Sequence, residues 1–214
     1  MTILALDTTS EFGSVAVRRA DETAAEIHLH SPEGFGHVIF AAIQEALVRA
    51  NTSLADIDCF AAASGPGSFT GVRVGLSAVK GLAEALGKPA ASVSNLRALS
   101  LFGHSALRAV VLDARRGEVY GAVYDNQARI VVPETVSTRA AWLASLPPGT
   151  EFVGFEDGPC AASSAAFTPA PRQLAAAVAR CAAMDGQAGW HDPVELDANY
   201  VRRSDAELLW KDRE

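Results

Sequence analysis

The sequence has few cysteines and a deficit of basic residues. Its three cysteines, Cys59, Cys160 and Cys181, lie far apart and form no CxxC pair, which argues against a disulfide framework and favours a cytoplasmic protein with free thiols. Lysine and arginine number 18 against 25 acidic residues, a net charge of -7. Because phosphate contacts need a basic patch, such a chain is a poor nucleic-acid binder alone, and a partner would have to supply the positive charge.

Long hydrophobic runs are also missing. No apolar run approaches the roughly 18 residues of a membrane span, and Asp7 interrupts the first apolar run, so we expect neither a membrane segment nor a signal peptide. Of the 214 residues, 49% are hydrophobic and 20% are charged. This composition predicts a packed core in one large domain or two small ones, in the cytoplasm.

Motifs for catalysis and metal binding are absent as well. The five histidines include no i, i+4 pair of the kind that holds a metal on a helix. The sequence contains no GxSxG elbow, and none of its cysteines has an evident histidine partner. We therefore predict no catalytic residue and no metal site.

The sequence does contain a glycine-rich loop, GPGSFTG, at residues 65–71, between an apolar run and a helical pattern. A P-loop would need a lysine close to its glycines, but the first lysine after the loop is Lys80. The glycine spacing does not fit a dinucleotide fingerprint either. Two interpretations remain: a structural turn, which we favour, or an anion site at the helix N-terminus. The loop residues that we single out are Gly65, Pro66, Gly67 and Gly71.

The start of the following helix fits the structural interpretation. Ser68 or Thr70 can cap the helix N-terminus. Gly71 and Gly75, four residues apart, allow the helix to lie close to a neighbouring backbone.

The helices at residues 37–50 and after the loop are apolar around most of their circumference. Arg73, Ser77, Lys80 and Glu84 fall on one narrow stripe of the second helix. Helices of this kind are buried on two sides, and the sheet covers only one. Either a partner subunit covers the other side, or the helices pack on each other and on the second domain. The sequence pattern alone does not decide between these.

The order of elements indicates an internal duplication. Residues 110–113 repeat the pattern of residues 4–7, each followed by a polar turn and a second strand. We predict two lobes, residues 1–104 and 105–214. The first lobe is expected to contain strands at 2–6, 12–17, 24–30, 57–64 and 92–94, with helices at 37–50, from about 72 to about 87, and at 95–102. The second is expected to contain strands at 110–113, 121–123, 129–133 and 152–155, with helices at 138–146 and 172–184. A capping box at residues 204–207 predicts a short terminal helix.

Asp7 and Asp113 occupy equivalent strand ends in this repeat. In phosphotransfer folds built from such repeats, an aspartate here can hold a metal or position a nucleophile. The turn after Asp7 lacks the glycine and lysine that would wrap a phosphate. We favour the alternative in which each aspartate hydrogen-bonds its own turn.

Four segments together resemble the bacterial TsaB (YeaZ) family. The most specific block is GPGSFTGVRVGL, and DARRGEVY is a second, independent match; the resemblance runs from residue 3 to about residue 124, with a weaker likeness at residues 199–202. The segments are ILALDTTSEFGSVAV (residues 3–17), SGPGSFTGVRVGLSAVKGLA (64–83), VSNLRALS (93–100) and VVLDARRGEVYGAVY (110–124).

The resemblance implies an α/β, actin/Hsp70-like ATPase fold (ASKHA, ribonuclease H-like) with two duplicated lobes. It implies a paralogue of the catalytic subunit TsaD, without the metal-binding histidine pair, that acts as a platform and not as an enzyme. The assembly transfers a threonylcarbamoyl group to the adenosine beside the anticodon in tRNAs that read codons beginning with A.

The resemblance also implies the partners. TsaD binds through the two helices of the first lobe, the same surface supports a homodimer, and the ATPase TsaE joins the assembly. tRNA is bound only through the complex, and no cofactor belongs to this chain alone, which leaves ATP or ADP at the junction with the partner. The residues carried over as partner-binding are His37, Phe40, Arg73, Leu76 and Lys80.

Two alternatives from other classes stay open. A kinase-like phosphotransferase of the same fold would need phosphate loops with glycine and lysine, which residues 7–11 do not supply. A glycoprotease-like peptidase would need a metal site or a nucleophile.

Overall fold

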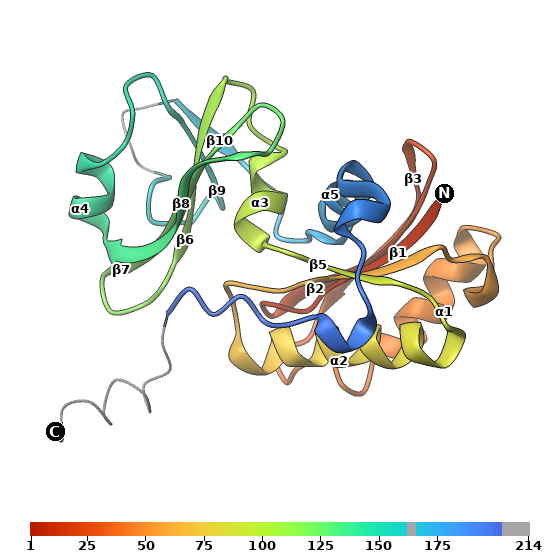
Figure 1. Cartoon of the computed structure of the whole chain (residues 1–214). Helices are drawn as coiled ribbons and strands as arrows, with labels where there is room; N and C mark the ends of the chain where they lie inside the picture. Colours follow the sequence, from red (N-terminus) through yellow and green to blue (C-terminus); the bar gives the residue numbers. More distant parts are fainter. Residues whose placement is uncertain (162–165, 203–214) are drawn as a thin grey trace, which may run out of the picture. The chain divides into compact units, whose positions relative to one another are not determined.

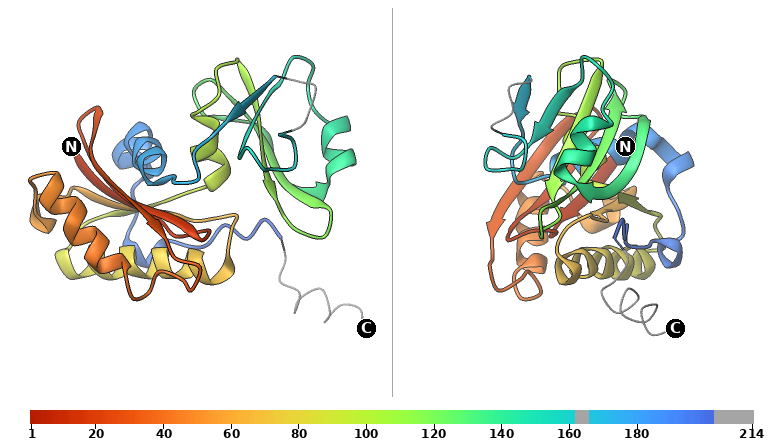
Figure 2. Two further views of the ribbon diagram at one scale, coloured as in Figure 1. Left: turned by 180° about the vertical axis from the view of Figure 1, so that it is seen from behind. Right: turned by 90° about the vertical axis from the view of Figure 1, so that its left-hand side faces the viewer.

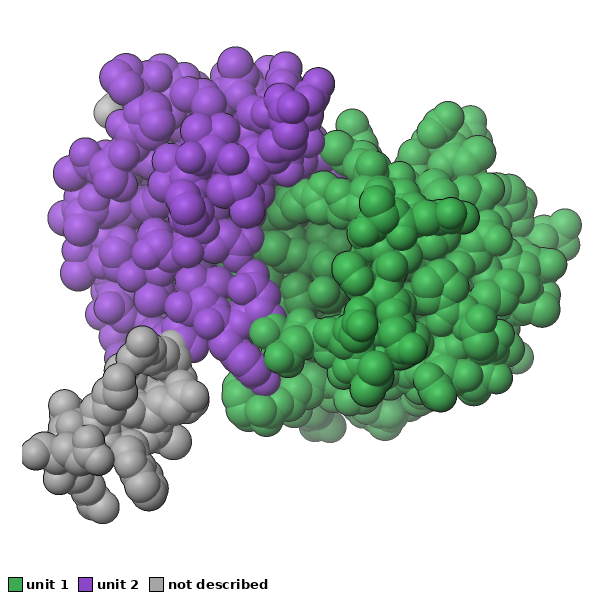
Figure 3. Space-filling model, in the orientation of Figure 1, with its two compact units in different colours: residues 1–99, 171–198 green, residues 100–170, 199–214 purple. Residues whose placement is uncertain are grey.

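The structure is a computed structural model that describes residues 1–161 and 166–202. The capping box expected at residues 204–207 lies outside the described residues. Contacts divide the chain into two compact units, coloured separately in Figure 3. Among the described residues, no helix has both the length and the apolar character needed to cross a membrane.

The first unit is built on a five-stranded sheet with the order β3-β2-β1-β4-β5 (Figure 1). The central strand β1 (Thr2–Asp7) pairs antiparallel with β2 (Phe12–Arg19) and parallel with β4 (Cys59–Ala63). β3 (Glu22–His30) and β5 (Ala90–Val93) form the two edges. All of β4 and nearly all of β1 are buried, as expected for apolar runs covered on both faces.

Helices cover both faces of this first sheet. α1 (Ile39–Arg49) and α2 (Phe69–Leu86) lie on one face, and α5 (Ala175–Asp185) lies on the other (Figures 1 and 2). α2 ends where the sequence predicts, because Gly87 adopts the left-handed conformation (φ 61°) that closes a helix. The shorter helical segments are η1 (Leu54–Asp56), α3 (Asn95–Ser100), η2 (Gly186–Gly189) and η3 (Pro193–Glu195).

The second unit repeats the same sheet, with the order β10-β9-β6-β7-β8. In each unit three successive strands pair antiparallel, and two further strands add in parallel on the other side of the first strand. This equivalence confirms the duplicated lobes. The elements of the second unit are β6 (Leu107–Asp113), β7 (Glu118–Asp125), β8 (Ile130–Thr138), α4 (Arg139–Ala144), β9 (Glu151–Gly154) and β10 (Phe167–Pro169).

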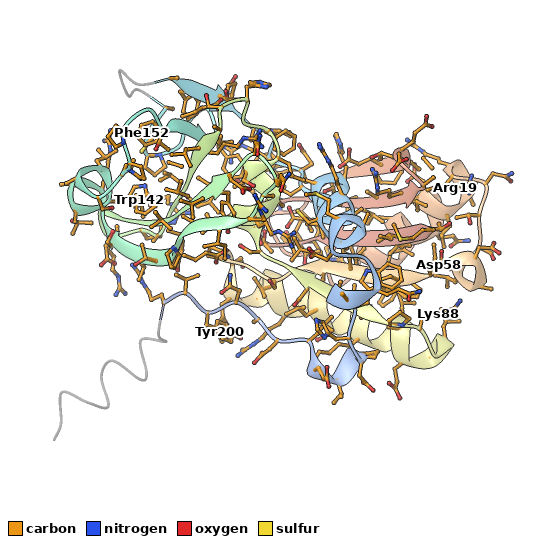
Figure 4. All side chains as sticks on the ribbon, turned by 45° about the horizontal axis from the view of Figure 1, so that its top comes forward. Arg19, Asp58, Lys88, Trp142, Phe152 and Tyr200 are labelled. Carbon is orange, nitrogen blue, oxygen red and sulfur yellow. The ribbon has the colours of Figure 1, made fainter. Side chains whose placement is uncertain are left out.

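A tryptophan anchors the core of the second unit. Trp142 of α4 is 2% exposed, and it clusters with apolar residues of the sheet that include Phe152 (Figure 4). Its indole lies directly over Gly121 of β7, where a Cβ atom would lie 2.5 Å from the ring. The position therefore admits only glycine while the tryptophan keeps its place.

The two units differ from the expected lobes of residues 1–104 and 105–214. The first unit comprises Met1–Leu99 and Pro171–Ala198, so α5 belongs to it although it follows the second sheet in sequence. The helix face that meets the first sheet is rich in alanine, which allows a close approach. The hydroxyl of Ser14 on β2 also accepts a hydrogen bond of 2.9 Å from the backbone amide of Ala175.

Candidate functional site

The turn that follows β1 is buried and bonded to itself. Asp7, Thr8 and Thr9 are exposed by only 1%, 1% and 5%. One carboxylate oxygen of Asp7 accepts hydrogen bonds from the backbone amide of Thr9 (3.0 Å) and from its hydroxyl (2.7 Å). The prediction that Asp7 bonds its own turn is therefore confirmed.

The N-terminus of α5 faces the same carboxylate. Burial raises the pKa of Asp7 above its ordinary value, while hydrogen bonds from Thr9 and from the backbone amide of Leu174 act in the opposite direction. Leu174 is the N-cap residue of α5, so the positive end of the helix dipole lies at the carboxylate. The next two amides donate to Ser14 (2.9 Å) and Glu26 (3.4 Å). Side chains of three strands thus satisfy this helix terminus.

Asn95 joins the turn to the GPGSFTG loop. Its side-chain nitrogen donates to the hydroxyl of Thr9 (2.6 Å), and its side-chain oxygen accepts from the backbone amide of Gly65 (2.9 Å). The backbone amide of Ser68 donates to the carbonyl oxygen of Thr9 (2.7 Å). Turn and loop form one hydrogen-bonded unit, in which the amides of Gly65 and Ser68 are satisfied by protein atoms. Sequence reasoning missed Asn95, although it lies within the VSNLRALS segment.

The backbone at the start of α2 packs directly against this turn. The hydroxyl of Ser68 accepts from the backbone amide of Gly71 (3.2 Å), which confirms the predicted cap. A Cβ atom at Gly71 would lie 2.0 Å from the carbonyl oxygen of Thr8, and one at Gly75 would lie 2.6 Å from its hydroxyl oxygen. The close approach expected of these two glycines is therefore confirmed. Of the loop residues singled out in the sequence, Gly65 and Pro66 are buried, Gly67 is exposed and Gly71 is half-buried.

The residues predicted to bind a partner differ in the surface that they offer. His37 and Arg73 are exposed, and Phe40 on α1 is 58% exposed. Lys80 is half-buried, and its ammonium nitrogen lies 3.4 Å from the carbonyl oxygen of Val194. These four side chains all reach the outside of the first unit.

Leu76 does not fit its predicted role. It is only 6% exposed and belongs to the hydrophobic core beneath α1 and α2. Most other apolar residues of α2 are buried or partly buried in the same core, so internal packing accounts for much of the apolar pattern of this helix. The apolar pattern of a helix indicates that a face is buried, but not whether the core of the same chain or a partner covers that face.

Sequence reasoning also missed two exposed apolar residues. Val48 is 72% exposed and lies two turns after Phe40, on the same face of α1. Phe69 at the start of α2 is 52% exposed, and the guanidinium of Arg73 lies 3.6 Å above the centre of its ring. We call Phe40, Val48, Phe69 and Arg73 the α1/α2 surface. Val48 could have been found from the sequence, because it lies eight residues after Phe40 on the same helix. Phe69 could not, because it adjoins a loop and belongs to no helical pattern in the sequence.

The equivalent turn of the second unit, after β6, is exposed. The carboxylate of Asp113 is 51% exposed and accepts from the backbone amide of Arg115 (2.7 Å), as predicted. Across residues 1–161 and 166–202, no three side chains of the metal-ligating types gather into a possible metal site.

Known proteins with similar sequences identify the family. A family model described as TsaD, tRNA N6-adenosine threonylcarbamoyltransferase, matches residues 32–175, more than half of the chain. An uncharacterized protein of Mycobacterium tuberculosis is 31% identical over 97% of this chain and 95% of its own length. The tRNA threonylcarbamoyladenosine biosynthesis proteins TsaB of Bacillus subtilis and Escherichia coli are 34% and 39% identical over 68% and 59% of this chain. The chain belongs to the TsaB (YeaZ) family.

The match to the two TsaB proteins spans 66% and 56% of their own lengths. Solved structures extend the likeness to the whole fold of this TsaB-family chain. YeaZ from Pseudomonas aeruginosa aligns with a TM-score of 0.76 at 26% identity, over 93% of this chain and 99% of that one. An uncharacterized protein with similarity to peptidase YeaZ, from the same organism, gives 0.78 at 27% identity, over 94% and 99%. The fold is therefore the actin/Hsp70-like fold expected from the sequence.

Proposed function

We propose that this chain is a non-catalytic subunit in tRNA threonylcarbamoyladenosine biosynthesis, which binds and supports a TsaD-type catalytic subunit in the cytoplasm. The names of its TsaB relatives and the TsaD family model support the pathway. The proposal extends to TsaE as a further partner and to a homodimer of the isolated chain through the same surface. It also places tRNA on the complex rather than on this chain alone, and ATP or ADP at the junction with the partner.

The α1/α2 surface is the observation that carries the proposal. Phe40, Val48 and Phe69 are each more than half exposed. Burying one large apolar side chain contributes about 1.5–3 kcal/mol, so a partner that covers all three gains substantially. Phe69 with its stacked Arg73 is an aromatic and arginine pair of the kind enriched at binding hot spots.

The Asp7 turn supports the non-catalytic part of the proposal. A catalytic carboxylate has to reach its substrate within hydrogen-bond distance. Asp7 is 1% exposed, and its carboxylate accepts hydrogen bonds from Thr9 and from the backbone amide of Leu174. The kinase-like alternative instead requires ATP turnover by the isolated chain that depends on this residue, which an Asp7→Asn variant would test.

Complex formation tests the platform role directly. We would mix the chain with the TsaD subunit of the same organism and measure the mass by light scattering. Phe40→Asp is expected to weaken the complex at least about 30-fold, because it buries a charge at a hot spot. Ile130→Asp on β8 is the matched control, since Ile130 is also 58% exposed. Leu76→Asp is unsuitable, because Leu76 belongs to the core.

Three outcomes decide the proposal. Loss of the complex in Phe40→Asp alone supports the α1/α2 surface as the binding site. Equal binding by wild type and both variants would move the interface elsewhere. Failure of the wild type to bind, with TsaE and ATP present, would overturn the platform role and favour the kinase-like alternative.

A further inference from the structure

Asn95 connects two separate segments next to the start of α2. Its side-chain nitrogen donates to the hydroxyl of Thr9 (2.6 Å), and its side-chain oxygen accepts from the backbone amide of Gly65 (2.9 Å). The backbone amide of Asn95 in turn donates to the carbonyl oxygen of Gly65 (2.9 Å). Asn95 is only 2% exposed, so truncating its side chain would leave the buried amide of Gly65 without its acceptor.

The same hydrogen bonds continue to the first residue of the α2 cap. The hydroxyl of Thr9, which accepts from Asn95, donates to the carboxylate of Asp7 (2.7 Å). The carbonyl oxygen of Thr9 accepts from the backbone amide of Ser68 (2.7 Å), and Ser68 is the N-cap residue of α2. The start of α2 is therefore attached to the sheet through Thr9, and Asn95 holds both Thr9 and the loop that leads into the helix.

Two residues of the α1/α2 surface begin directly after this attachment. Phe69 is the first residue of α2, it is 52% exposed, and Arg73 stacks on its ring one helical turn later. Both side chains project from the first turns of one helix, so a tilt of that helix end would move them together. A binding group loses affinity when the residues that support it no longer fix its orientation.

We propose that Asn95 is a positioning residue for partner binding, which holds Phe69 and Arg73 in the orientation that the TsaD-type subunit recognises. The inference rests on the proposed function. Asn95 is too deeply buried to touch a partner, so it acts through the start of α2. Its primary amide suits this role because it offers a donor to Thr9 and an acceptor to Gly65 at the same time.

Affinity for the TsaD subunit, measured in two backgrounds, tests the inference. In the wild-type chain, Asn95→Ala is expected to weaken binding about 10-fold. In a Phe69→Ala chain the same substitution should weaken binding less than about 2-fold, because the side chain through which Asn95 acts is gone.

Ser14→Ala is the matched control. Ser14 is fully buried in the same unit and accepts one hydrogen bond from the backbone amide of Ala175 (2.9 Å). It faces α5, on the opposite side of the sheet from α2 (Figure 1). Ser14→Ala should lower the urea midpoint of unfolding as Asn95→Ala does, but it should leave the affinity for TsaD unchanged.

Hydrogen exchange in the isolated chain gives a second readout. The amides of Gly65 and Ser68 are bonded to Asn95 and Thr9. In Asn95→Ala, amides of residues 65–71 should exchange about 10-fold faster than in wild type, whereas Ser14→Ala should leave them unchanged.

The contrary outcomes are distinct. Unchanged TsaD affinity in Asn95→Ala, or equal weakening in the wild-type and Phe69→Ala backgrounds, would overturn the inference. Equal weakening by Ser14→Ala would assign the effect to general stability and overturn it as well. Unchanged exchange of residues 65–71 in Asn95→Ala would show that Asn95 does not hold the loop. If the wild type does not bind TsaD at all, the proposed function fails and the inference with it, which the mass measurement reveals before any variant is compared.

Discussion

Replacing Gly75 by alanine tests the close packing between α2 and the turn after β1. A methyl group at this position would lie 2.6 Å from the hydroxyl oxygen of Thr8. That hydroxyl donates a hydrogen bond of 2.7 Å to the carbonyl oxygen of Gly71. Gly81 on the same helix is the natural control, because a Cβ atom there meets nothing within 4 Å.

The expected magnitudes follow from these contacts. Alanine is more favourable than glycine in a helix interior by about 1 kcal/mol, so Gly81→Ala should raise the free energy of unfolding by that amount. Gly75→Ala gains the same term but displaces Thr8 and breaks its hydrogen bond, a loss of about 1 kcal/mol. Overpacking adds about 1–3 kcal/mol. The net result is a free energy of unfolding lowered by about 1–3 kcal/mol.

Urea unfolding with a double-mutant cycle provides the assay. Thr8→Ala removes the obstacle, so Thr8→Ala/Gly75→Ala should be more stable than the sum of the single changes predicts, by about 1–2 kcal/mol. The slopes of the unfolding transitions should agree among the variants. The reasoning would be refuted if Gly75→Ala stabilised the chain as much as Gly81→Ala, or if the cycle gave no coupling.

Three further predictions concern buried and hydrogen-bonded ionisable groups. Because burial raises the pKa of Asp7, the folded chain binds this proton more tightly than the unfolded chain, and Asp7→Asn should gain stability relative to wild type as the pH rises above about 4. A hydrogen bond from the backbone amide of Arg129 lowers the pKa of Asp125, so Asp125→Asn should lose stability relative to wild type as the pH rises toward about 4. Urea unfolding from about pH 3 to 8 should therefore show changes of opposite sign in the relative stability of the two variants as the pH rises. Changes of the same sign would contradict both assignments. Burial raises the pKa of Cys59 and Cys181 to about 12, so a thiol reagent at neutral pH should label them only as the chain unfolds, and rapid labelling of the folded chain would contradict this placement.

The duplicated sheets could be predicted because apolar runs and polar turns recur in the same order in both halves. Two features could not. β10 (Phe167–Pro169) has only three residues, too few for a periodic pattern. α5 was expected from its sequence, but nothing in its alanine-rich pattern indicates which sheet it covers. Its place is set by distant groups such as Ser14, 161 residues from its bonding partner Ala175.

The candidate site divides in the same way. The Ser68 cap and the Asp7 turn could be predicted because each bonds a residue within three positions. The role of Asn95 could not, because its side chain joins residues 30 and 86 positions away. Leu76 was assigned to the partner interface although it lies in the core, because an apolar position on a helix indicates burial but not which element covers it. Core and interface give the same sequence signal there.

The duplication allows the two turns to be compared directly, because each follows the first strand of the sheet in its own unit. After β1, the aspartate turn is bonded inward to Asn95 and pressed against Gly71, so the GPGSFTG loop serves to fix where α2 begins. After β6, the aspartate turn keeps its local hydrogen bond, but its neighbours Arg115 and Arg116 are exposed. The two turns share the aspartate that accepts from the backbone amide two residues further on, but only the turn after β6 has residues with positive φ. The turn after β1 is therefore enclosed by the protein, whereas the turn after β6 lies at the surface.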